Sequence, residues 1–329
     1  MINMNEALEK LHQILGDKAK IHYPLDSLTT FKIGGPADLY YEARTCQEFL
    51  TVVRAARKLG VPIFILGGGS NLLIADKGIR GLVIKNMTKQ IGIKGIKSQK
   101  QGSLMKKIVY VEADSGVPIN LLVRFTVDEG LTGLHMHLGL PGSVGGAVYM
   151  NSKWTHPTGY VGDYVYQARI LTYDGEEKIV PQSYFHFAYD TSSIQKSKDI
   201  VLSVVFALTV ENKERLWAIA NDSIAHRKRT QPQGVFTAGC TFRNLTQSEA
   251  LLFSTPEGTM SAGFLIDHAG LKGISVGGAM ISLQHANFIV NTGKATAKDV
   301  IELIEIVRAK VKEQFGITLS EEIERIGEF

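Results

Sequence analysis

The chain has 329 residues, of which 44% are hydrophobic and 21% are charged, and its formal net charge is +4. This length exceeds what one ordinary hydrophobic core uses, so we expect two or three domains. The composition is typical of a globular protein rather than a disordered one, and the mild positive charge gives no argument for nucleic-acid binding.

The start of the chain and its cysteines indicate a compartment. Acids and amides stand where a signal peptide has an apolar run, in "MINMNEALEKLHQILGDK". The longest apolar stretch, "IVLSVVFALTV", is about half as long as a membrane span. The two cysteines, Cys46 and Cys240, form neither a CxxC pair nor a zinc-site spacing. We therefore expect a reduced, soluble, cytoplasmic protein with no membrane insertion and no metal site.

The first third of the chain predicts a small α/β unit after an N-terminal helix. Residues 45–60 predict a helix that begins with a capping box of Thr45 and Glu48 and ends at Gly60. The apolar run "VPIFIL" predicts a buried strand that ends at three glycines, and "GIRGLVIKN" predicts another short strand.

The middle of the chain predicts strands around one helix and a second glycine-rich loop. The lysine-rich stretch after residue 90 predicts a solvated hairpin or loop, and "IVYVEAD" a strand. Residues 117–130 predict a helix, which the loop "LPGSVGGA" follows. Residues 164 to 210 alternate like strands, and Asp174 and Gly175 predict a hairpin turn between two of them.

The last third predicts mainly helices. One helix ends in the basic cluster "HRKR", and "SAGFLIDHAGLKG" predicts another with a glycine stop. "ANFIVN" predicts a strand. The clearest helix begins with a capping box of Thr296 and Asp299, ends at Gly316 and carries an apolar stripe, namely Val300, Leu303, Ile304, Val307 and Val311.

The glycine triplet at residues 67–69 indicates phosphate binding, because backbone N–H groups in such loops hold anions. A P-loop needs a lysine after its glycines, and none follows here. A dinucleotide fingerprint needs a third glycine where Leu72 stands. The loops "GGGSN" and "LPGSVGGA" could instead hold one diphosphate from both sides; the alternative is that both are tight turns.

Long motifs in a fixed order identify a family. They include "SLTTFKIGGPADLY", "FILGGGSNLLI", "LGLPGSVGGAVYMN", "TAGCTFRN" and "HANFIVN", and they extend along almost the entire chain. With them the sequence resembles the UDP-N-acetylenolpyruvoylglucosamine reductases, flavoproteins of bacterial cell-wall precursor synthesis. The resemblance implies an α+β fold, with a two-part FAD-binding region of the vanillyl-alcohol-oxidase type and a C-terminal α+β substrate domain. We expect FAD-binding subdomains at residues 1–88 and 89–214 and the substrate domain at residues 215–329.

The resemblance also implies the reaction and its cofactors. NADPH reduces FAD, and the hydride then passes to the enolpyruvyl double bond of UDP-N-acetylglucosamine enolpyruvate, which yields UDP-N-acetylmuramate for peptidoglycan. The expected partner is a small nucleotide-sugar substrate, with no nucleic acid and no protein partner. FAD contacts are expected from the two loops, at Gly67, Gly68, Gly69, Ser70, Asn71, Gly142, Ser143, Gly145 and Gly146.

Two catalytic residues follow from the matched motifs. Cys240 stands where the family has a serine proton donor, and a thiol with a pKa near 8.5 is mostly protonated at neutral pH. The alternative is that Cys240 is a small buried residue of the core. Glu322 matches the family's catalytic glutamate, which would polarise the substrate carboxyl group, although Glu321 and Glu324 are close competitors.

Substrate contacts are expected at Arg227, Asn244, Lys272 and His285. Arg227 suits the UDP diphosphate, and the alternative is an ordinary charged helix end. For His285 the alternative is a hydrogen-bonded structural histidine.

One position reverses the family's charge. The family's third catalytic group is an arginine, and this chain has Asp190 there, in "FAYDTSS". Either another cation does its work, such as Arg243 or one of the basic cluster, or the chemistry has changed. The second case implies a related FAD oxidoreductase or a flavin or nucleotide-sugar binding protein with impaired catalysis. The segment at residues 152–163 also departs from the family pattern.

Overall fold

The computed structural model describes residues 3–101, 104–155 and 158–329. The chain divides into two compact units that interleave along the sequence. Unit 1 consists of Met1–Ala19, Tyr41–Gly68 and Ile84–Arg227, and unit 2 of Lys20–Tyr40, Gly69–Val83 and Lys228–Phe329. The chain passes between them within β2 (Pro36–Ala43) and β5 (Ile79–Asn86). This division groups residues by contacts, and the expected boundaries at residues 88 and 214 stay predictions.

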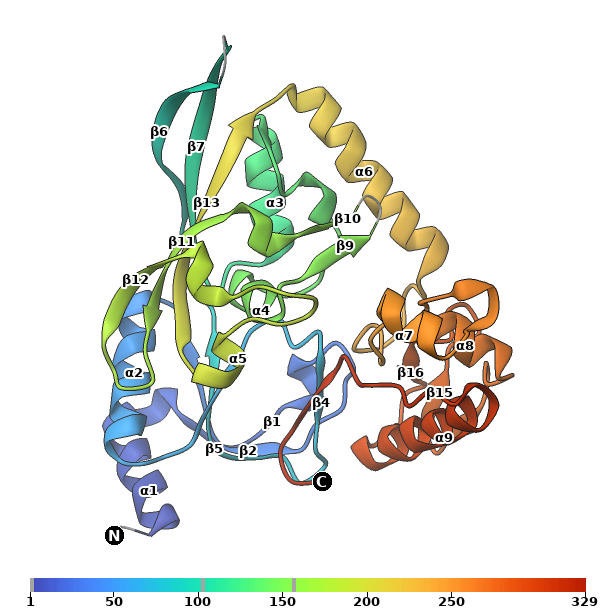
Figure 1. Cartoon of the computed structure of the whole chain (residues 1–329). Coiled ribbons are helices and arrows are strands. Elements are labelled where there is room, and N and C mark those ends of the chain that lie inside the picture. Colours follow the sequence, from blue (N-terminus) through green and yellow to red (C-terminus); the bar gives the residue numbers. More distant parts are fainter. Residues whose placement is uncertain (1–2, 102–103, 156–157) are drawn as a thin grey trace. The chain divides into compact units, whose positions relative to one another are not determined.

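Unit 1 is built on a mainly antiparallel sheet with the order β12-β11-β13-β7-β6. Its strands are β6 (Ile91–Gln101), β7 (Leu104–Asp114), β11 (Val165–Leu171), β12 (Glu177–Pro181) and β13 (Ile200–Val210), and the short β8 (Leu131–Thr132) pairs with β13. The predicted lysine-rich hairpin is confirmed as β6 and β7, which project beyond the rest of the sheet (Figure 1). Its residues 102–103 lie outside the described residues. The predicted turn at Asp174 and Gly175 joins β11 to β12.

The core of unit 1 lies between this sheet and its helices. Apolar residues of β7, β11 and β13 pack with those of α3 (Ile119–Asp128), α4 (Val144–Met150) and the first part of α6 (Lys213–Thr230). The predicted helix after Pro118 is confirmed as α3. Further short elements are β9 (Lys153–Thr155), β10 (Thr158–Tyr160), α5 (Ile194–Ser197) and the 3₁₀ helices η3 (His135–His137), η4 (Val161–Tyr164) and η5 (Gln182–Phe185).

The N-terminal part of unit 1 contains α1 (Met4–Leu15), η1 (Gly16–Lys18), α2 (Cys46–Lys58) and β3 (Ile63–Leu66). Thr45 caps α2, because its hydroxyl accepts the Glu48 N–H at 3.1 Å. The prediction that the Glu48 side chain completes a capping box with Thr45 is wrong. The Glu48 carboxylate binds instead the Tyr41 hydroxyl at 2.6 Å, the Arg44 N–H at 2.9 Å and the Lys18 ammonium at 2.9 Å. Burial alone would raise the pKa of Glu48, but these hydrogen bonds lower it to about 2.

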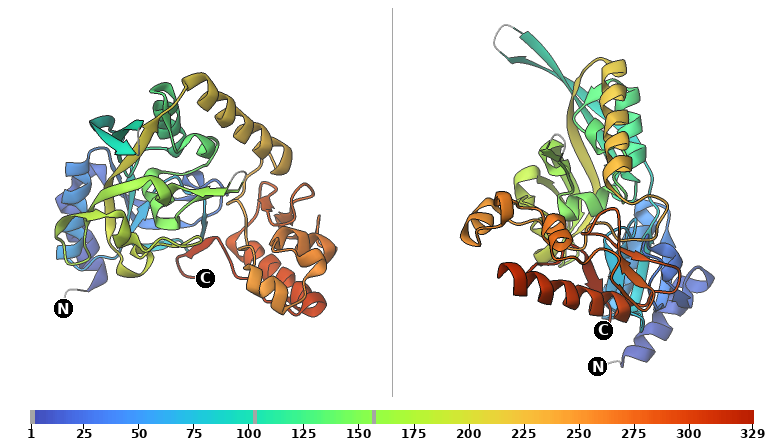
Figure 2. Two further views of the ribbon diagram at one scale, coloured as in Figure 1. Left: turned by 45° about the horizontal axis from the view of Figure 1, so that its top comes forward. Right: turned by 90° about the vertical axis from the view of Figure 1, so that its right-hand side faces the viewer.

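Unit 2 contains a small sheet covered by two helices. The sheet has the order β14 (Ser275–Val276), β15 (Ala279–Ile281) and β16 (Ile289–Asn291), and α8 (Ala262–His268) and α9 (Ala297–Phe315) pack beside it (Figure 2). The capping box of Thr296 and Asp299 is confirmed, and all five residues of the predicted α9 stripe are buried. Gly316 ends α9 with a φ of +72°, as a helix-terminating glycine does.

Other segments complete unit 2. β1 (Lys20–Pro24) pairs antiparallel with β2, and β4 (Leu72–Ile74) pairs parallel with β17 (Glu324–Ile326). The remaining elements are α7 (Gln247–Leu252) and the 3₁₀ helices η2 (Asp26–Leu28) and η6 (Pro256–Gly258). No helix among the described residues is long and apolar enough to cross a membrane.

The second glycine-rich segment differs from its expectation as a loop. α4 begins at Val144, so Gly145 and Gly146 lie in the first turn of a helix. Ser143 caps this helix, because its hydroxyl accepts the Gly146 N–H at 3.3 Å. A favourable cap and the packing of Val144, Ala147 and Val148 in the core outweigh the low helix propensity of glycine.

Candidate active site

The two glycine-rich segments touch each other in unit 1. A Cβ atom added to Gly68 would lie 2.5 Å from the Cα of Gly142, and one added to Gly67 would overlap the Ser143 hydroxyl. Only glycine permits such a close approach of two backbones. The pairing of these two segments, predicted from their similar composition, therefore exists in the structure.

Backbone donors are available where the two segments meet. Among the described residues of unit 1, no group accepts a hydrogen bond from the N–H groups of Gly68, Gly142 and Ser143. The N–H groups of Gly145 and Gly146 are used inside the protein, by the Ser115 carbonyl at 2.7 Å and the Ser143 hydroxyl at 3.3 Å. The donors left for a diphosphate in unit 1 are thus those of Gly68 and of the start of the second segment, and their contact with FAD stays a prediction. The expected FAD contacts of Gly145 and Gly146 stay predictions, and their own N–H groups are not available for such contacts.

A half-buried cation adjoins the first segment. The Lys85 ammonium donates to the Gly67 carbonyl at 2.5 Å. Burial lowers the pKa of Lys85, and the charge of Glu42 opposes that effect in part. An anion bound beside a partly desolvated ammonium would stabilise its charge further. The chemistry of these residues therefore fits the diphosphate of FAD, and sequence reasoning missed Lys85 because a lysine within a strand carries no motif.

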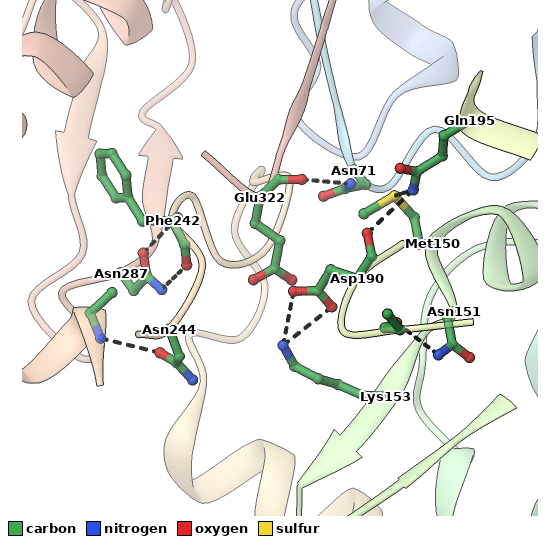
Figure 3. A network of polar contacts seen from close by, with 12 residues as sticks. Asn71, Met150, Asn151, Lys153, Asp190, Gln195, Phe242, Asn244, Asn287 and Glu322 are labelled. Atoms are coloured by element: carbon green, nitrogen blue, oxygen red, sulfur yellow. Dashed lines mark hydrogen bonds and ion pairs between the residues drawn. The ribbon is translucent and has the colours of Figure 1, made fainter. Parts of the chain in front are cut away.

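Asn71 joins the first glycine-rich segment to the end of the chain within unit 2. Its side-chain amide donates to the Glu322 carbonyl at 3.0 Å, and its own carbonyl accepts the Glu324 N–H at 2.9 Å (Figure 3). Asn71 was expected to contact FAD, and that contact stays a prediction. What the structure assigns to it is the attachment of the segment that contains Glu322 and leads into β17.

The two candidate catalytic residues lie on neighbouring extended segments of unit 2. Cys240 is half-buried and forms a β-bridge with Phe288, while Thr241 accepts the Glu322 N–H at 2.8 Å. On the same side Phe242 forms a bridge with Glu321. The segment that begins at Cys240 thus lies between two others, and the backbone of Glu322 is bonded to the residue next to Cys240.

Asn287 fixes this segment from its other side. Its side chain accepts the Phe242 N–H at 2.9 Å and donates to the Phe242 carbonyl at 2.8 Å (Figure 3). Asn287 and Phe242 are both buried. The two hydrogen bonds satisfy backbone groups that water does not reach, and they hold the segment on which Cys240 stands.

The structure separates Glu322 from its nearest competitor. The Glu321 carboxylate is bound by Arg308 at 2.5 Å and by Arg325 at 2.6 Å. Glu321 is therefore committed to a charge network that anchors the end of the chain. The catalytic role of Glu322 stays a prediction from the motif match.

The expected substrate residues fall in both units. In unit 2, the Asn244 side chain accepts the Ala262 N–H at 3.1 Å at the start of α8. Lys272 forms an ion pair with Asp267 at 2.6 Å. In unit 1, the Arg227 guanidinium lies 4.1 Å from the centroid of the Trp154 ring. Their contacts with substrate stay predictions.

His285 has the contacts of a structural histidine as well as its predicted role. Its Nδ1 accepts the Asn287 N–H at 3.2 Å, and its ring packs edge-on against Phe288 at 4.9 Å. Burial lowers the pKa of His285, so the ring is neutral at neutral pH. The proton then resides on Nε2, which makes that nitrogen a donor.

Asp190 has a cationic partner that the sequence did not indicate. Lys153 binds both carboxylate oxygens of Asp190, at 3.0 and 3.2 Å (Figure 3). Of the cations proposed from sequence, Arg227 lies on the Trp154 ring in the same unit, and a role for Arg243 stays a prediction. In the sequence, the signal for Lys153 was indirect. The charge at position 190 is reversed, and residues 152–163, which include Lys153, also depart from the family pattern.

Comparisons with known proteins agree with this arrangement. The family described as an FAD binding domain matches residues 37–180, and the one described as the C-terminal domain of UDP-N-acetylenolpyruvoylglucosamine reductase matches residues 231–326. The reductase of Lachnoclostridium phytofermentans is 37% identical over 325 residues, which cover 98% of either chain. The chain belongs to the UDP-N-acetylenolpyruvoylglucosamine reductase family.

Other members of this reductase family support the assignment. The reductase of Bacillus pumilus is 37% identical over 306 residues, which cover 93% of either chain. The crystal structure of the reductase from Thermus caldophilus has a TM-score of 0.73 at 33% identity, and the match covers 94% of this chain and 98% of that one. The α+β fold class and the resemblance seen in the sequence are confirmed. In the part of the chain that the structure describes, no group of three His, Cys, Asp or Glu side chains is placed to hold a metal ion.

Proposed function

We propose that this chain is an FAD-dependent enzyme that uses NADPH to reduce UDP-N-acetylglucosamine enolpyruvate to UDP-N-acetylmuramate in peptidoglycan precursor synthesis. One observation carries the proposal beyond family membership. The backbone of Glu322 is bonded on one side to Asn71 of the glycine-rich segment and on the other to Thr241, next to Cys240. Within unit 2, the cofactor segment and both candidate acids form one hydrogen-bonded arrangement.

The chain's own residues would hold the cofactor and supply a proton. The N–H groups of Gly68 and Gly142 and the Lys85 ammonium would bind the FAD diphosphate. FAD, when bound, would supply the hydride transfer from NADPH to one carbon of the enolpyruvyl double bond. As the electron pair of that double bond moves to the neighbouring carbon, the Cys240 thiol gives this carbon its proton.

The remaining residues bind and polarise the substrate. Glu322 is assigned to the substrate carboxyl group, where negative charge develops as the double bond is reduced. Lys272, His285, Asn244 and Arg227 are assigned to the nucleotide-sugar. The Nε2 of His285 acts as a neutral donor. A small-molecule substrate and a cytoplasmic location belong to the same proposal, and it includes no protein partner.

The alternatives left open by the sequence have no support here. A related FAD oxidoreductase or an impaired binding protein was suggested by Asp190 alone. The members of the family reported above are all named as this reductase. The pairing of Asp190 with Lys153 also means that the reversed charge does not leave the position without a cation.

Anaerobic stopped-flow spectroscopy tests the proposal. The holoprotein should lose its oxidised-flavin absorbance when NADPH is added. UDP-N-acetylglucosamine enolpyruvate should then restore the absorbance, with UDP-N-acetylmuramate as product. An oxidase would bleach with an unmodified sugar in the absence of NADPH. Bleaching by NADPH without recovery on the enolpyruvyl substrate would refute the proposed reaction.

A further inference from the structure

Two buried opposite charges lie where the family has a single arginine. The Lys153 ammonium is 3.0 Å from the nearer carboxylate oxygen of Asp190 (Figure 3). Only 14% of the Lys153 side chain and 5% of the Asp190 side chain are exposed. A buried ion pair contributes little net stability, because desolvation offsets most of the Coulomb attraction. The pair therefore calls for a chemical explanation rather than a structural one.

The backbone around Asp190 is rigidly held. Ala188 and Thr191 bond to each other in both directions, at 3.1 and 3.3 Å, which places Tyr189 and Asp190 at the tip of a tight turn. Asp190 has a φ of +51°, in the left-handed region that glycine, asparagine and aspartate adopt most readily. The Gln195 side chain donates to its carbonyl at 3.2 Å. The Asp190 carboxylate is thus set in one direction, toward Lys153.

Lys153 is fixed from two further sides. Its ammonium lies 3.5 Å from the centroid of the Tyr189 ring, a cation–π contact. Its strand β9 follows α4, whose last turn is bonded to the same tight turn. The Ser192 hydroxyl donates to the Tyr149 carbonyl at 2.6 Å, and the Asn151 amide donates to the Ala188 carbonyl at 2.9 Å.

The same helix connects Lys153 to the expected cofactor site. α4 begins at the Ser143 cap, beside Gly67 and Gly68, and has seven residues. A helix of this length is roughly 10 Å long. Within unit 1, Lys153 thus follows a short helix that begins at the segments expected to meet the diphosphate.

We propose that Lys153, positioned by Asp190, binds the carboxylate of the enolpyruvyl substrate and stabilises the negative charge that develops as that substrate is reduced. The inference rests on the proposed function. Lys153 makes direct contact with the substrate and is thus a catalytic residue. Asp190 acts through Lys153 and is a positioning residue. In this chain the cation has moved from position 190 to a neighbouring strand, and Asp190 keeps it in place.

Paired double variants test the inference without leaving a buried charge alone. Lys153→Met/Asp190→Asn removes both charges, and Lys153→Met/Asp190→Arg places a cation at position 190. Lys178→Met is the matched control, since Lys178 forms an exposed ion pair with Glu176 in the same unit. All three should retain FAD and bleach with NADPH as the unmodified holoprotein does.

The first readout is recovery of the flavin absorbance with the enolpyruvyl substrate. We expect the uncharged double variant to recover about 100-fold more slowly than the unmodified protein, the effect of losing one charged stabiliser. The Lys153→Met/Asp190→Arg variant should recover at least tenfold faster than the uncharged double variant, a difference that corresponds to about 1.4 kcal/mol. The Lys178→Met variant should match the unmodified protein.

The second readout is binding, measured by calorimetry on the oxidised holoprotein. UDP-N-acetylmuramate carries a carboxylate, and UDP-N-acetylglucosamine does not. The uncharged double variant should bind the first ligand at least tenfold more weakly and the second with unchanged affinity. A merely structural ion pair would weaken both ligands together or neither, and either result overturns the inference.

The outcomes also separate this inference from the proposed function. If the unmodified protein fails to recover on the enolpyruvyl substrate, the proposed function is wrong. If it recovers and the uncharged double variant recovers equally fast, the function stands and the role of Lys153 is overturned. A Lys153→Met/Asp190→Arg variant that recovers no faster than the uncharged one also overturns it.

Discussion

Replacing Asn287 by alanine should both destabilise unit 2 and slow proton delivery. The Asn287 side chain makes two hydrogen bonds, of 2.9 and 2.8 Å, to the N–H and C=O groups of Phe242. Both residues are at most 2% exposed, so water does not replace the lost partners. Each buried group left unsatisfied costs about 1–3 kcal/mol, so we expect a loss of roughly 2–6 kcal/mol in the free energy of unfolding.

The functional part of this prediction follows from the place of Phe242. It stands two residues after Cys240, and the Asn287 side chain holds that segment. Loosening the segment should misplace the thiol and slow flavin recovery on the enolpyruvyl substrate by about 10-fold or more, since a small misplacement of a reacting group is costly. Bleaching by NADPH should be unchanged.

Asn291→Ala is the matched control. Asn291 is also a buried asparagine of unit 2, and its amide donates to the Phe31 carbonyl at 3.0 Å. It should lose comparable stability without the selective loss of the second half-reaction. Urea denaturation followed by circular dichroism and anaerobic stopped-flow spectroscopy measure the two effects. A loss below about 0.5 kcal/mol in Asn287→Ala, or recovery at the unmodified rate, would contradict the reasoning.

Three further predictions concern single residues. Cys240→Ala should keep FAD and bleach with NADPH but recover on the enolpyruvyl substrate about 100-fold more slowly, and Cys240→Ser should retain substantial activity; equal rates in the alanine variant would remove Cys240 as proton donor. Lys85→Met should weaken FAD retention, measured as flavin released on dilution, by about tenfold, because a half-buried positive charge beside the Gly67 carbonyl is lost. Glu48→Gln should cost up to about 3 kcal/mol in the free energy of unfolding at pH 7, since the pKa of Glu48 is lowered to about 2 from 4.5. A carboxylate with a lowered pKa stabilises the fold above its ordinary pKa, so the difference from the unmodified protein should disappear as the pH falls from about 5 to 2; a difference independent of pH would contradict the assignment.

Local sequence signals predicted the elements whose partners are close in the chain. α9 has both halves of its capping box, its apolar stripe and its terminal glycine within about twenty residues, and all are found in the structure. The start of α2 was predicted only in part. Glu48 has the spacing of a capping-box residue, but it binds Tyr41 and Lys18, which tertiary packing brings to it. Competition from distant partners is not visible in a local pattern.

In the candidate site, too, the residues that stand in local motifs were predicted and those that depend on distant partners were not. Cys240 and Glu322 were identified from motifs, and the structure places their segments side by side in unit 2. Lys153 was missed, because its bond to Asp190 joins residues 37 positions apart and depends on how one tight turn packs on α4. The interleaving of the two units was not predicted either. No change of composition marks the points within β2 and β5 where the chain passes from one unit to the other.

The pairing of β4 with β17 bears on how the protein is made. The bond from Asn71 to Glu322 joins residues 251 positions apart, and β4 lies parallel to the last strand of the chain. During synthesis the glycine-rich segment therefore emerges well before its partner strand β17. Closing so large a loop costs entropy and is slow relative to local folding. The edge of the cofactor segment is completed only after β17 has been made, so a nascent chain that still lacks β17 does not hold this segment as the native protein does.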